Sequence, residues 1–449
     1  MKEAQRPRPL LHFTPKSGWI NDPLALTWHN GQYHLFFQFV PDRTTWAPDC
    51  RWGHATSPDL ITWTEHPAAL EPGEGDDGIW SGSIAVDDDG RPTIFYTSVK
   101  VPDFGIGTVR TATPVDDDWM IWTKGEMVVE APLLDAIAFR DPFLMRDDDQ
   151  WRMLVGTALE GGDAAASSFV SDDLRTWTFE GLAASRNTRE IEPVWTGALW
   201  ECPQIFTIDG RDVMVTSVWQ DDELHYVAYA IGMFDDGRFV AEHWGRLTYG
   251  DSYYAPSYFR DRDGLPCLIF WMRGVIDEDS GRASALSVPH VLRLDGDILV
   301  AAPHPTVELA ASRNLTDSPA PTRVALDVGA EWAVTNAAGT LTMHRNDEAV
   351  SCSWLGAVTA IPARFREVEF LVDGETVELF TGTALFSVGA DSPFTDVAQL
   401  EPRQQRRRLS RPCIEVVVDR VNNHPAADEP EMTAEDPRRL HSWSPELRE

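Results

Sequence analysis

Short runs of apolar, β-branched and aromatic residues, each preceded by a turn signal, fill the first two thirds of the chain. Asn-Gly or Asp-Gly precedes the runs QYHLFFQF, RPTIFYTS, RDVMVTSV and LPCLIFW, and Asp149-Gln150 precedes WRMLVGT. Asn-Gly and Asp-Gly tolerate positive φ and are common in two-residue β-hairpin turns. The pattern therefore predicts short antiparallel strands rather than helices.

These turn signals return at a nearly constant interval. Their second residues have the numbers 31, 90, 150, 210 and 264, and SPDLITW at 57–63 returns as SDDLRTW at 171–177. Five copies of a unit of about 55–60 residues, each holding several short strands, indicate a β-propeller. The predicted fold is all-β, with a five-bladed β-propeller catalytic domain over residues 1–305.

The pattern changes after about residue 300. Residues 306–322 are rich in Pro, Ser and Ala and are predicted to form a linker. Strand-like runs such as TRVALDV, REVEFLVDG and TVELFTG follow, which predicts a smaller C-terminal β-sandwich over residues 323–402. Residues 403–449 have the composition of a poorly ordered tail, apart from IEVVV at 414–418.

The repeat also aligns side chains from different blades. Nine residues before the successive turn residues stand Asp22, Ser81, Asp141, Glu201 and Ala255. In a propeller the first strand of each blade lines the central channel, so these positions are expected to converge. Three carboxylates at one level repel one another and cost stability unless function requires them. The sequence therefore predicts a functional site on the axis.

Composition and charge narrow the possible partners. The chain has 449 residues, of which 43% are hydrophobic and 24% charged, with 38 Lys and Arg against 71 Asp and Glu and a formal net charge of −33. Such a charge repels phosphate backbones and anionic membranes, so nucleic acid and membrane partners are not expected. The N-terminal residues show no signal-peptide pattern, and we therefore expect a cytoplasmic location.

The cysteines and histidines give no sign of a metal site. The five cysteines are odd in number and form no CxxC pair, and the twelve histidines show no HxH or HExxH spacing. These patterns argue against a disulfide scaffold and against zinc. We expect neither a metal nor another cofactor.

Several sequence blocks resemble known signatures. HFTPKSGWINDPLAL at 12–26, FRDPFL at 139–144 and WECPQIF at 200–206 resemble the three signature blocks of the glycoside hydrolase family 32 β-fructosidases, which include invertases, inulinases, levanases and plant fructosyltransferases. Further blocks, RWGHATSPDLITWTEHPAAL at 51–70 and YGDSYYAPSYF at 249–259, agree in order. The resemblance covers about residues 10–300. It implies a five-bladed propeller with an appended sandwich, as the repeat does.

The resemblance implies roles for the three acids. Cleavage of a fructofuranoside passes through an oxocarbenium-like transition state and needs two carboxylates in different protonation states. Asp22 would be the nucleophile that forms a fructosyl-enzyme, and Glu201 the general acid and then the general base. Asp141 would hold sugar hydroxyls, and Arg140 is a candidate counter-charge. Retention follows if Asp22 and Glu201 stand about 5–5.5 Å apart.

Other residues in the matching blocks are candidates for substrate binding. Those expected around the fructosyl unit are Asn21, Gln38, Trp46, Trp80 and Ser81, and those expected on the rim are Tyr254 and Trp271. Trp63 and Trp177 occupy the repeated DLxxW motif and are interpreted as packing residues. The family commonly continues NDP with Asn-Gly, whereas here Leu24 and Ala25 follow, and Val40 replaces a common Asn. Both changes put sucrose specificity in question.

The predicted activity is release of fructose from sucrose, fructo-oligosaccharides, inulin or levan. A fructosyltransferase would use the same intermediate and is the nearest alternative. An inverting arabinan- or xylan-type hydrolase shares the propeller, but the NDP and ECP blocks speak against it. A non-catalytic carbohydrate-binding propeller is disfavoured because Asp22, Asp141 and Glu201 are all present. The sequence leaves the linkage, the endo or exo mode and the oligomeric state open.

Overall fold

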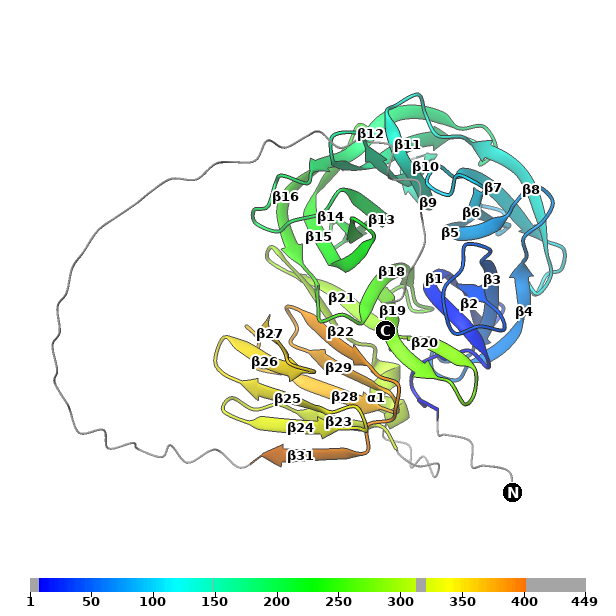
Figure 1. Ribbon diagram of the computed structural model, residues 1–449. Helices are drawn as coiled ribbons and strands as arrows, with labels where there is room; N and C mark the ends of the chain where they lie inside the picture. The colour runs from blue at the N-terminus through cyan, green and yellow to red at the C-terminus, as the bar shows by residue number, and fades with distance from the viewer. Residues whose placement is uncertain (1–7, 148, 312–319, 401–449) are drawn as a thin grey trace, which may run out of the picture. The chain divides into compact units, whose positions relative to one another are not determined.

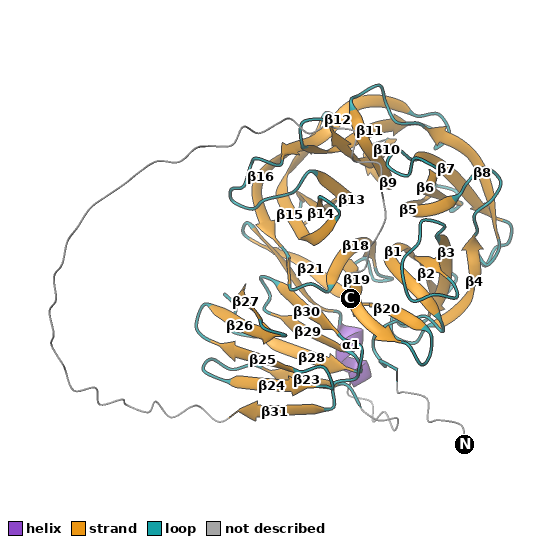
Figure 2. Ribbon diagram, viewed as in Figure 1, coloured by secondary structure: helices purple, strands orange, loops and turns teal. Residues whose placement is uncertain are grey.

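The computed structural model describes residues 8–147, 149–311 and 320–400. Within these ranges the chain forms 31 strands and one short helix, so the prediction of a nearly all-β fold is confirmed (Figure 2). No helix in the described ranges is long and apolar enough to cross a membrane. The tail predicted for residues 403–449 lies outside the described residues.

Three four-stranded sheets follow one another along the chain. Within each sheet the strands are hydrogen-bonded in sequence order, and consecutive strands are antiparallel. The strands are β5 (Gly78–Val86), β6 (Pro92–Val99), β7 (Thr108–Pro114) and β8 (Trp122–Val129); β9 (Ala136–Asp147), β10 (Gln150–Leu159), β11 (Asp163–Ser171) and β12 (Thr178–Asn187); and β13 (Leu199–Ile208), β14 (Arg211–Gln220), β15 (Glu223–Asp235) and β16 (Arg238–Arg246).

A nine-stranded sheet joins the beginning of this region to its end. A short parallel pairing of Gly18 with Arg282 and of Trp19 with Ala283 makes the connection. Its strands are β1 (Gly18–His29), β2 (Gln32–Val40), β3 (Arg51–Ser57), β4 (Thr64–Leu70), β18 (Tyr253–Arg260), β19 (Pro266–Asp277), β20 (Arg282–Leu286), β21 (His290–Asp295) and β22 (Ile298–Pro303). In Figure 1 the four sheets lie around a common centre, with β1, β5, β9, β13 and β18 nearest to it.

The position of a strand within its sheet explains its sequence. β6 (PTIFYTSV) is second in its sheet and is buried along nearly its whole length, which matches its almost continuous apolar run. β8 (WTKGEMVV) is the outermost strand of the same sheet and fully buries only its two end residues. The apolar runs that follow the turn signals are therefore the second strands, buried between neighbouring sheets.

Two five-stranded sheets form the C-terminal part. One contains β17 (Thr248–Tyr249), β23 (Thr322–Ala325), β28 (Glu369–Asp373), β29 (Thr376–Phe380) and β30 (Leu385–Gly389), and the other contains β24 (Glu331–Thr335), β25 (Thr340–Arg345), β26 (Ala349–Trp354), β27 (Ala357–Pro362) and β31 (Asp396–Leu400). Both sheets contribute to one hydrophobic core, for example through Val334 and Met343 on one side and Phe370 and Leu379 on the other.

Helix α1 (Pro305–Ala311) lies where a linker was expected. Val307 and Ala310 are buried in the same core as Leu292 and Leu299 of the nine-stranded sheet. Because this turn of helix buries apolar side chains, the described start of the segment is packed structure. The Pro- and Ser-rich composition gave no sign of that burial.

Candidate active site

A β-bulge interrupts each of the five inner strands at a corresponding place. The register shifts lie between Asn21 and Pro23, Trp80 and Gly82, Arg140 and Phe143, Glu201 and Gln204, and Tyr254 and Ser257. A bulge leaves extra residues unpaired and redirects their side chains. The bulges include non-glycine residues with positive φ, namely Asp22 (+21°), Asp141 (+66°), Cys202 (+48°) and Ala255 (+41°). Such conformations are costly and cluster at functional sites.

The bulges define two successive levels of side chains. The residues directly before the bulge are Asn21, Trp80, Arg140, Glu201 and Tyr254, and the first bulged residues are Asp22, Ser81, Asp141, Cys202 and Ala255. Most of the predicted site residues belong to these two levels. The bulges thus bring together residues that lie far apart in the sequence.

The alignment of Glu201 with Asp22 and Asp141 is wrong by one residue. Gln150 pairs with Asp147, so the β9–β10 hairpin turns one residue earlier than Asp149-Gln150 indicated. β1 also carries a second irregularity between Leu24 and Thr27. Counted with these corrections, Glu201 is level with Arg140, and Cys202 is level with the two aspartates.

Asp22 is held by three polar side chains. Its Oδ2 accepts a hydrogen bond from the Ser81 hydroxyl, and its Oδ1 accepts one from the Asn21 amide at 2.9 Å. The Gln38 amide lies 3.4 Å from Asp22 Oδ2 and also donates to the Ser81 oxygen. Burial raises the pKa of Asp22 to about 6, against the hydrogen bonds from Ser81 and Asn21, and the charge of Glu201 adds to the rise.

Asp141 is anchored through its backbone and its side chain. Its amide N–H donates to Thr97 Oγ1 at 2.8 Å, and its Oδ2 accepts from the Cys202 amide at 3.1 Å. Burial raises the pKa of Asp141 to about 7; the Arg140 guanidinium opposes this, and the other two carboxylates contribute to it. The predicted mutual repulsion of the three acids is therefore present.

Each carboxylate oxygen of Glu201 has its own partner. Arg140 Nη2 lies 2.9 Å from Glu201 Oε1, and the Tyr254 hydroxyl donates to Glu201 Oε2 at 2.7 Å. The Arg140 and Glu201 side chains are 6% and 16% exposed. The candidate counter-charge Arg140 thus forms its ion pair with Glu201.

The predicted aromatic residues form two groups. The rings of Trp46 and Trp80 lie 5.7 Å apart, and Arg140 lies 5.9 Å from the Trp80 ring. The Trp271 ring lies 6.3 Å from that of Tyr254. Both groups therefore adjoin residues that contact the acids.

Trp19 belongs to the site and was missed. Its indole N–H donates to Asn21 Oδ1 at 3.1 Å, and its ring lies 5.7 Å from that of Trp271. Trp19 stands two residues before Asn21 in β1, and side chains two apart share a face of a strand. That spacing was the available signal.

This sequence matches the model of one protein family. The model of the Glycosyl hydrolases family 32 N-terminal domain matches residues 12–303. The match includes every inner strand and all three acids. The chain belongs to glycoside hydrolase family 32.

Curated relatives in family 32 match a similar span. The sucrose-6-phosphate hydrolase of Zymomonas mobilis is 31% identical over 325 residues, which are 67% of this chain and 62% of that protein. The fructan 6-exohydrolase of Beta vulgaris is 29% identical over 64% of this chain and 52% of that protein. The matched span is thus about three fifths of the length of the first of these relatives and about half of the second.

Solved structures of family 32 share the fold. A beta-fructofuranosidase from Bombyx mori has a TM-score of 0.73 at 24% identity, covering 87% of this chain and 90% of that one. A sucrose-6-phosphate hydrolase from Lactobacillus gasseri has a TM-score of 0.72 at 21% identity, covering 88% and 91%. Both likenesses extend beyond the family 32 model into the C-terminal sheets.

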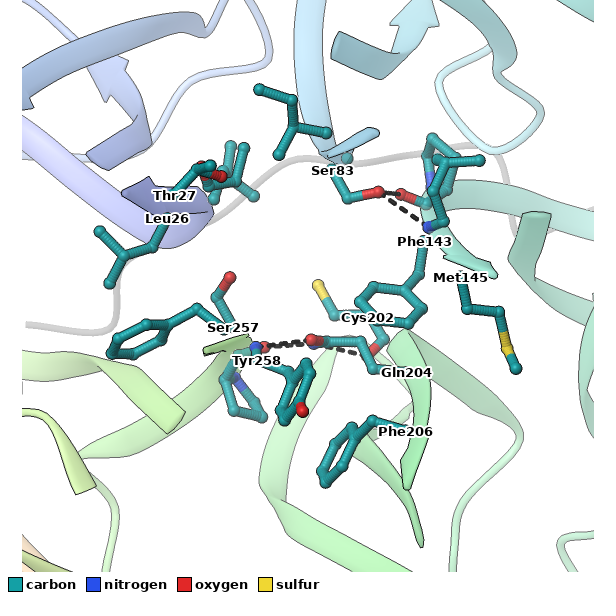
Figure 3. A pocket seen from close by; sticks show the side chains of 18 of the residues that line it. Leu26, Thr27, Ser83, Phe143, Met145, Cys202, Gln204, Phe206, Ser257 and Tyr258 are labelled. Atoms are coloured by element: carbon teal, nitrogen blue, oxygen red, sulfur yellow. Dashed lines mark hydrogen bonds between the residues drawn. The ribbon is translucent and has the colours of Figure 1, made fainter. Parts of the chain in front are cut away.

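A cavity of 420 Å³ lies along the inner strands, with Asp141 and Cys202 among its lining residues. Figure 3 shows its wall of mixed polar and apolar side chains, formed by residues that follow the bulges, among them Leu26, Thr27, Ser83, Phe143, Met145, Gln204, Phe206, Ser257 and Tyr258. Inside the wall, Gln204 Oε1 accepts from the Tyr258 amide at 2.7 Å. None of the predicted substrate-binding residues lines this cavity.

The two departures from the common family 32 pattern lie in different surroundings. Leu24 and Ala25 are buried in a hydrophobic cluster with Phe36 and Trp52. They are therefore core residues and cavity lining rather than part of the polar contacts around Asp22. Val40 is buried in a cluster with Trp80, and only this second change adjoins a predicted binding residue.

Proposed function

We propose that this chain is a retaining glycoside hydrolase that releases fructose from β-fructofuranosides. The observation that carries the proposal is the convergence of Asp22, Asp141 and Glu201 from three inner strands, with charges that act on one another. Buried carboxylates that repel one another cost stability, so a function is needed to explain them. The names of the family 32 relatives support a fructose-containing substrate.

We assign the chemical steps to two of the acids. Asp22 attacks the anomeric carbon of the fructosyl unit while Glu201 gives its proton to the leaving oxygen, so that an ester to Asp22 forms as the glycosidic bond breaks. Glu201 then takes a proton from water, the water oxygen attacks the anomeric carbon, and Asp22 leaves as a carboxylate. Overall, one glycosidic bond and one water become free fructose and an alcohol.

The surroundings of the acids support these roles. With a pKa of about 6, Asp22 is mostly ionised at neutral pH, as a nucleophile must be, and Ser81 and Asn21 fix its direction. With a pKa of about 7, Asp141 exists in both protonation states near neutrality. It is therefore able both to accept and to donate hydrogen bonds to sugar hydroxyls.

We propose that the four sheets around the centre are a five-bladed propeller, with β1–β4 and β18–β22 as the blades that the β1–β20 pairing joins. The corresponding bulges in five inner strands support it. We propose that the two C-terminal sheets are a β-sandwich, which their shared core supports. The proposed domains are residues 1–305 and 323–402.

The test is a screen of purified protein against sucrose, sucrose 6-phosphate, short fructo-oligosaccharides, inulin and levan. Products are separated by chromatography, and free fructose is quantified. Asp22→Ala is the inactive control, and Asp89→Ala, at a carboxylate that is 69% exposed, is the matched control. The anomeric form of the first product, followed by NMR, tests retention.

Each outcome has a defined meaning. Free fructose from one or more sugars, lost in Asp22→Ala and kept in Asp89→Ala, is the expected result. Longer or cyclic products in place of fructose would move the assignment to a fructosyltransferase. No turnover of any of the five sugars would refute the proposed activity and leave the family and the fold.

A further inference from the structure

Arg273 of β19 lies against the ring of Tyr254 in the neighbouring strand β18. The guanidinium carbon is 5.1 Å from the ring centroid. Arg273 Nη1 donates to the Leu224 carbonyl at 2.8 Å, and Nη2 is 3.4 Å from the His225 carbonyl. The backbone of β15 therefore fixes the position of the guanidinium, and the guanidinium supports the phenol ring.

The Tyr254 hydroxyl has two acceptors within reach. It lies 2.7 Å from Glu201 Oε2 and 3.2 Å from the Val218 carbonyl oxygen. A phenol has one hydrogen to donate. When Glu201 is a carboxylate, Tyr254 donates to it; when Glu201 carries a proton, Glu201 donates to the phenol oxygen and the phenol hydrogen turns to Val218. Both protonation states of Glu201 are thus hydrogen-bonded.

We propose that Arg273 is a positioning residue for Glu201 and acts on it through Tyr254. The inference rests on the proposed function, in which Glu201 must alternate between its acid and carboxylate forms. A cation over a ring face attracts the ring electrons, which makes the phenol O–H a stronger donor. Arg273 therefore favours the state in which Tyr254 donates to a carboxylate.

The other charged and titratable groups around Glu201 define what Arg273 adds. Arg140 contacts one carboxylate oxygen directly. The charges of Asp22 and Asp141 act against the Glu201 carboxylate, and the thiol of Cys202 adjoins all three acids. Arg273 is a second cation that interacts with Glu201, from the side of Tyr254. Its removal should weaken the hydrogen bond that Tyr254 donates to the Glu201 carboxylate.

The chain supplies a matched control for this contact. The Arg246 guanidinium lies 4.0 Å from the Tyr226 ring and 4.3 Å from the Tyr249 ring, and its Nε donates to the Thr248 carbonyl at 2.8 Å. It makes the same kind of contact as Arg273, with phenol rings that have no hydrogen bond to Glu201. Arg246→Met therefore removes a similar cation without touching the acids.

The experiment compares wild type, Arg273→Met, Arg273→Lys and Arg246→Met as full chains. Each is assayed for kcat and KM between pH 4 and 9, using the sugar of the preceding screen that wild type cleaves best, and its melting temperature is recorded. For Arg273→Met we expect kcat to fall about five- to tenfold and KM to change less than about twofold. In the plot of kcat/KM against pH, the fall on the alkaline side should move about half a pH unit upward. Arg273→Lys should keep most of the wild-type profile.

A double-mutant cycle tests the route through Tyr254. If Arg273 acts through the phenol, Arg273→Met should add little to the loss caused by Tyr254→Phe. Additive losses, an unshifted limb in Arg273→Met, or an equal shift in Arg246→Met would overturn the inference while leaving the proposed function intact. A wild-type chain that cleaves no sugar would overturn both. If Arg273→Met does not fold, the same cycle is measured with Arg273→Lys in its place, alone and combined with Tyr254→Phe.

Discussion

Two clusters of buried charge in this molecule are built differently. The axis cluster consists of Asp22, Asp141, Glu201 and Arg140. The second, which we call the His12 cluster, consists of His12, Asp373, Glu378 and Tyr253, and connects the N-terminal segment and β18 to the C-terminal sheet. Most side chains of both clusters are buried, although Asp22 and Glu201 on the axis are only partly so, so burial does not mark the axis cluster as the functional one.

In the His12 cluster every carboxylate oxygen is paired. His12 Nδ1 is 2.8 Å from Asp373 Oδ2, and His12 Nε2 is 2.9 Å from Glu378 Oε2. The Tyr253 hydroxyl and the Leu10 amide supply donors to the remaining two oxygens. Burial opposes the charge on His12, yet the two carboxylates raise the pKa of its imidazole to about 10.

The axis cluster sets three carboxylates against the one cation Arg140, whereas the His12 cluster sets two against one. On the axis, burial and the neighbouring carboxylates raise the pKa values of Asp22 and Asp141. The raised pKa of His12 means that the fold stabilises its charged form, whereas the raised pKa values of Asp22 and Asp141 mean that their charged forms cost folding free energy. The comparison teaches that a functional site is marked by charges the fold leaves uncompensated, more than by buried charge as such.

The largest expected effect is on activity, in the axis cluster. Asp22→Asn keeps the shape of the side chain but removes the nucleophile, and kcat/KM should fall by about 10⁴-fold or more. Because the surplus charge is reduced, the melting temperature should stay the same or rise. Activity assays and thermal unfolding of one preparation measure both. A fall in the melting temperature would mean that Asp22 holds the fold and would break the comparison.

The largest expected effect on stability is in the His12 cluster. Glu378→Ala removes the acceptor of His12 Nε2 and of the Tyr253 hydroxyl, while Asp373 still pairs with His12 Nδ1. The loss of a buried ion pair with two donors left unpaired should cost about 3–5 kcal/mol of unfolding free energy. Denaturant unfolding at pH 7 measures this. The folded fraction should retain its kcat, since the His12 cluster contacts none of the three axis acids. A loss of less than about 1 kcal/mol would show that pairing in this cluster is not stabilising.

A third prediction compares how the stability contributed by two buried aspartates, Asp76 and Asp141, depends on pH. Asp76 is bound by Arg110 at 2.8 Å and by Lys124 at 3.0 Å. Burial opposes its charge, but hydrogen bonds from Ser98 and from these two cations lower the pKa of Asp76. Since the pKa of Asp141 is raised to about 7, substitution by Asn should have opposite effects at the two positions.

The signs follow from proton linkage. A raised pKa means that ionised Asp141 costs stability above about pH 7, and the cost disappears as the pH falls towards 4. Asp141→Asn should therefore be more stable than wild type at pH 8 by at least about 1 kcal/mol, and equal to it near pH 4. Asp76→Asn should be less stable at pH 8, and its deficit should shrink below pH 4. Equal signs at pH 8 would contradict the contrast.

The sequence predicted those features of the fold that depend on local turn chemistry. Hairpin turns such as Asn30-Gly31 gave the repeat, and the repeat gave Asp22 and Asp141 as partners on the axis. The level of Glu201 was wrong by one residue for two reasons: a second irregularity adds a residue to β1, and the β9–β10 hairpin turns one residue earlier than Asp149-Gln150 indicated. The family resemblance placed Glu201 in the site independently of that count.

Contacts between distant segments gave no such signal. His12 and Asp373 are 361 residues apart in the chain and bond directly. Arg273 reaches Glu201 through the ring of Tyr254, a contact that depends on the pairing of β19 with β18. Side chains of this kind follow no period, so sequence patterns do not reveal them, and the structure was needed to find both.

The smallest expected effect tests whether burial gives the His12 cluster its strength. Arg51 Nη1 and Glu71 Oε1 are 3.2 Å apart, but their side chains are 27% and 62% exposed. Water and salt screen such a pair, so Glu71→Ala should change the unfolding free energy by no more than about 0.5 kcal/mol, and 1 M NaCl should remove that change. The cost of Glu378→Ala should persist in the same salt, because buried charges are screened much less. If salt removed both costs alike, burial would not be what separates the His12 cluster from an ordinary surface ion pair.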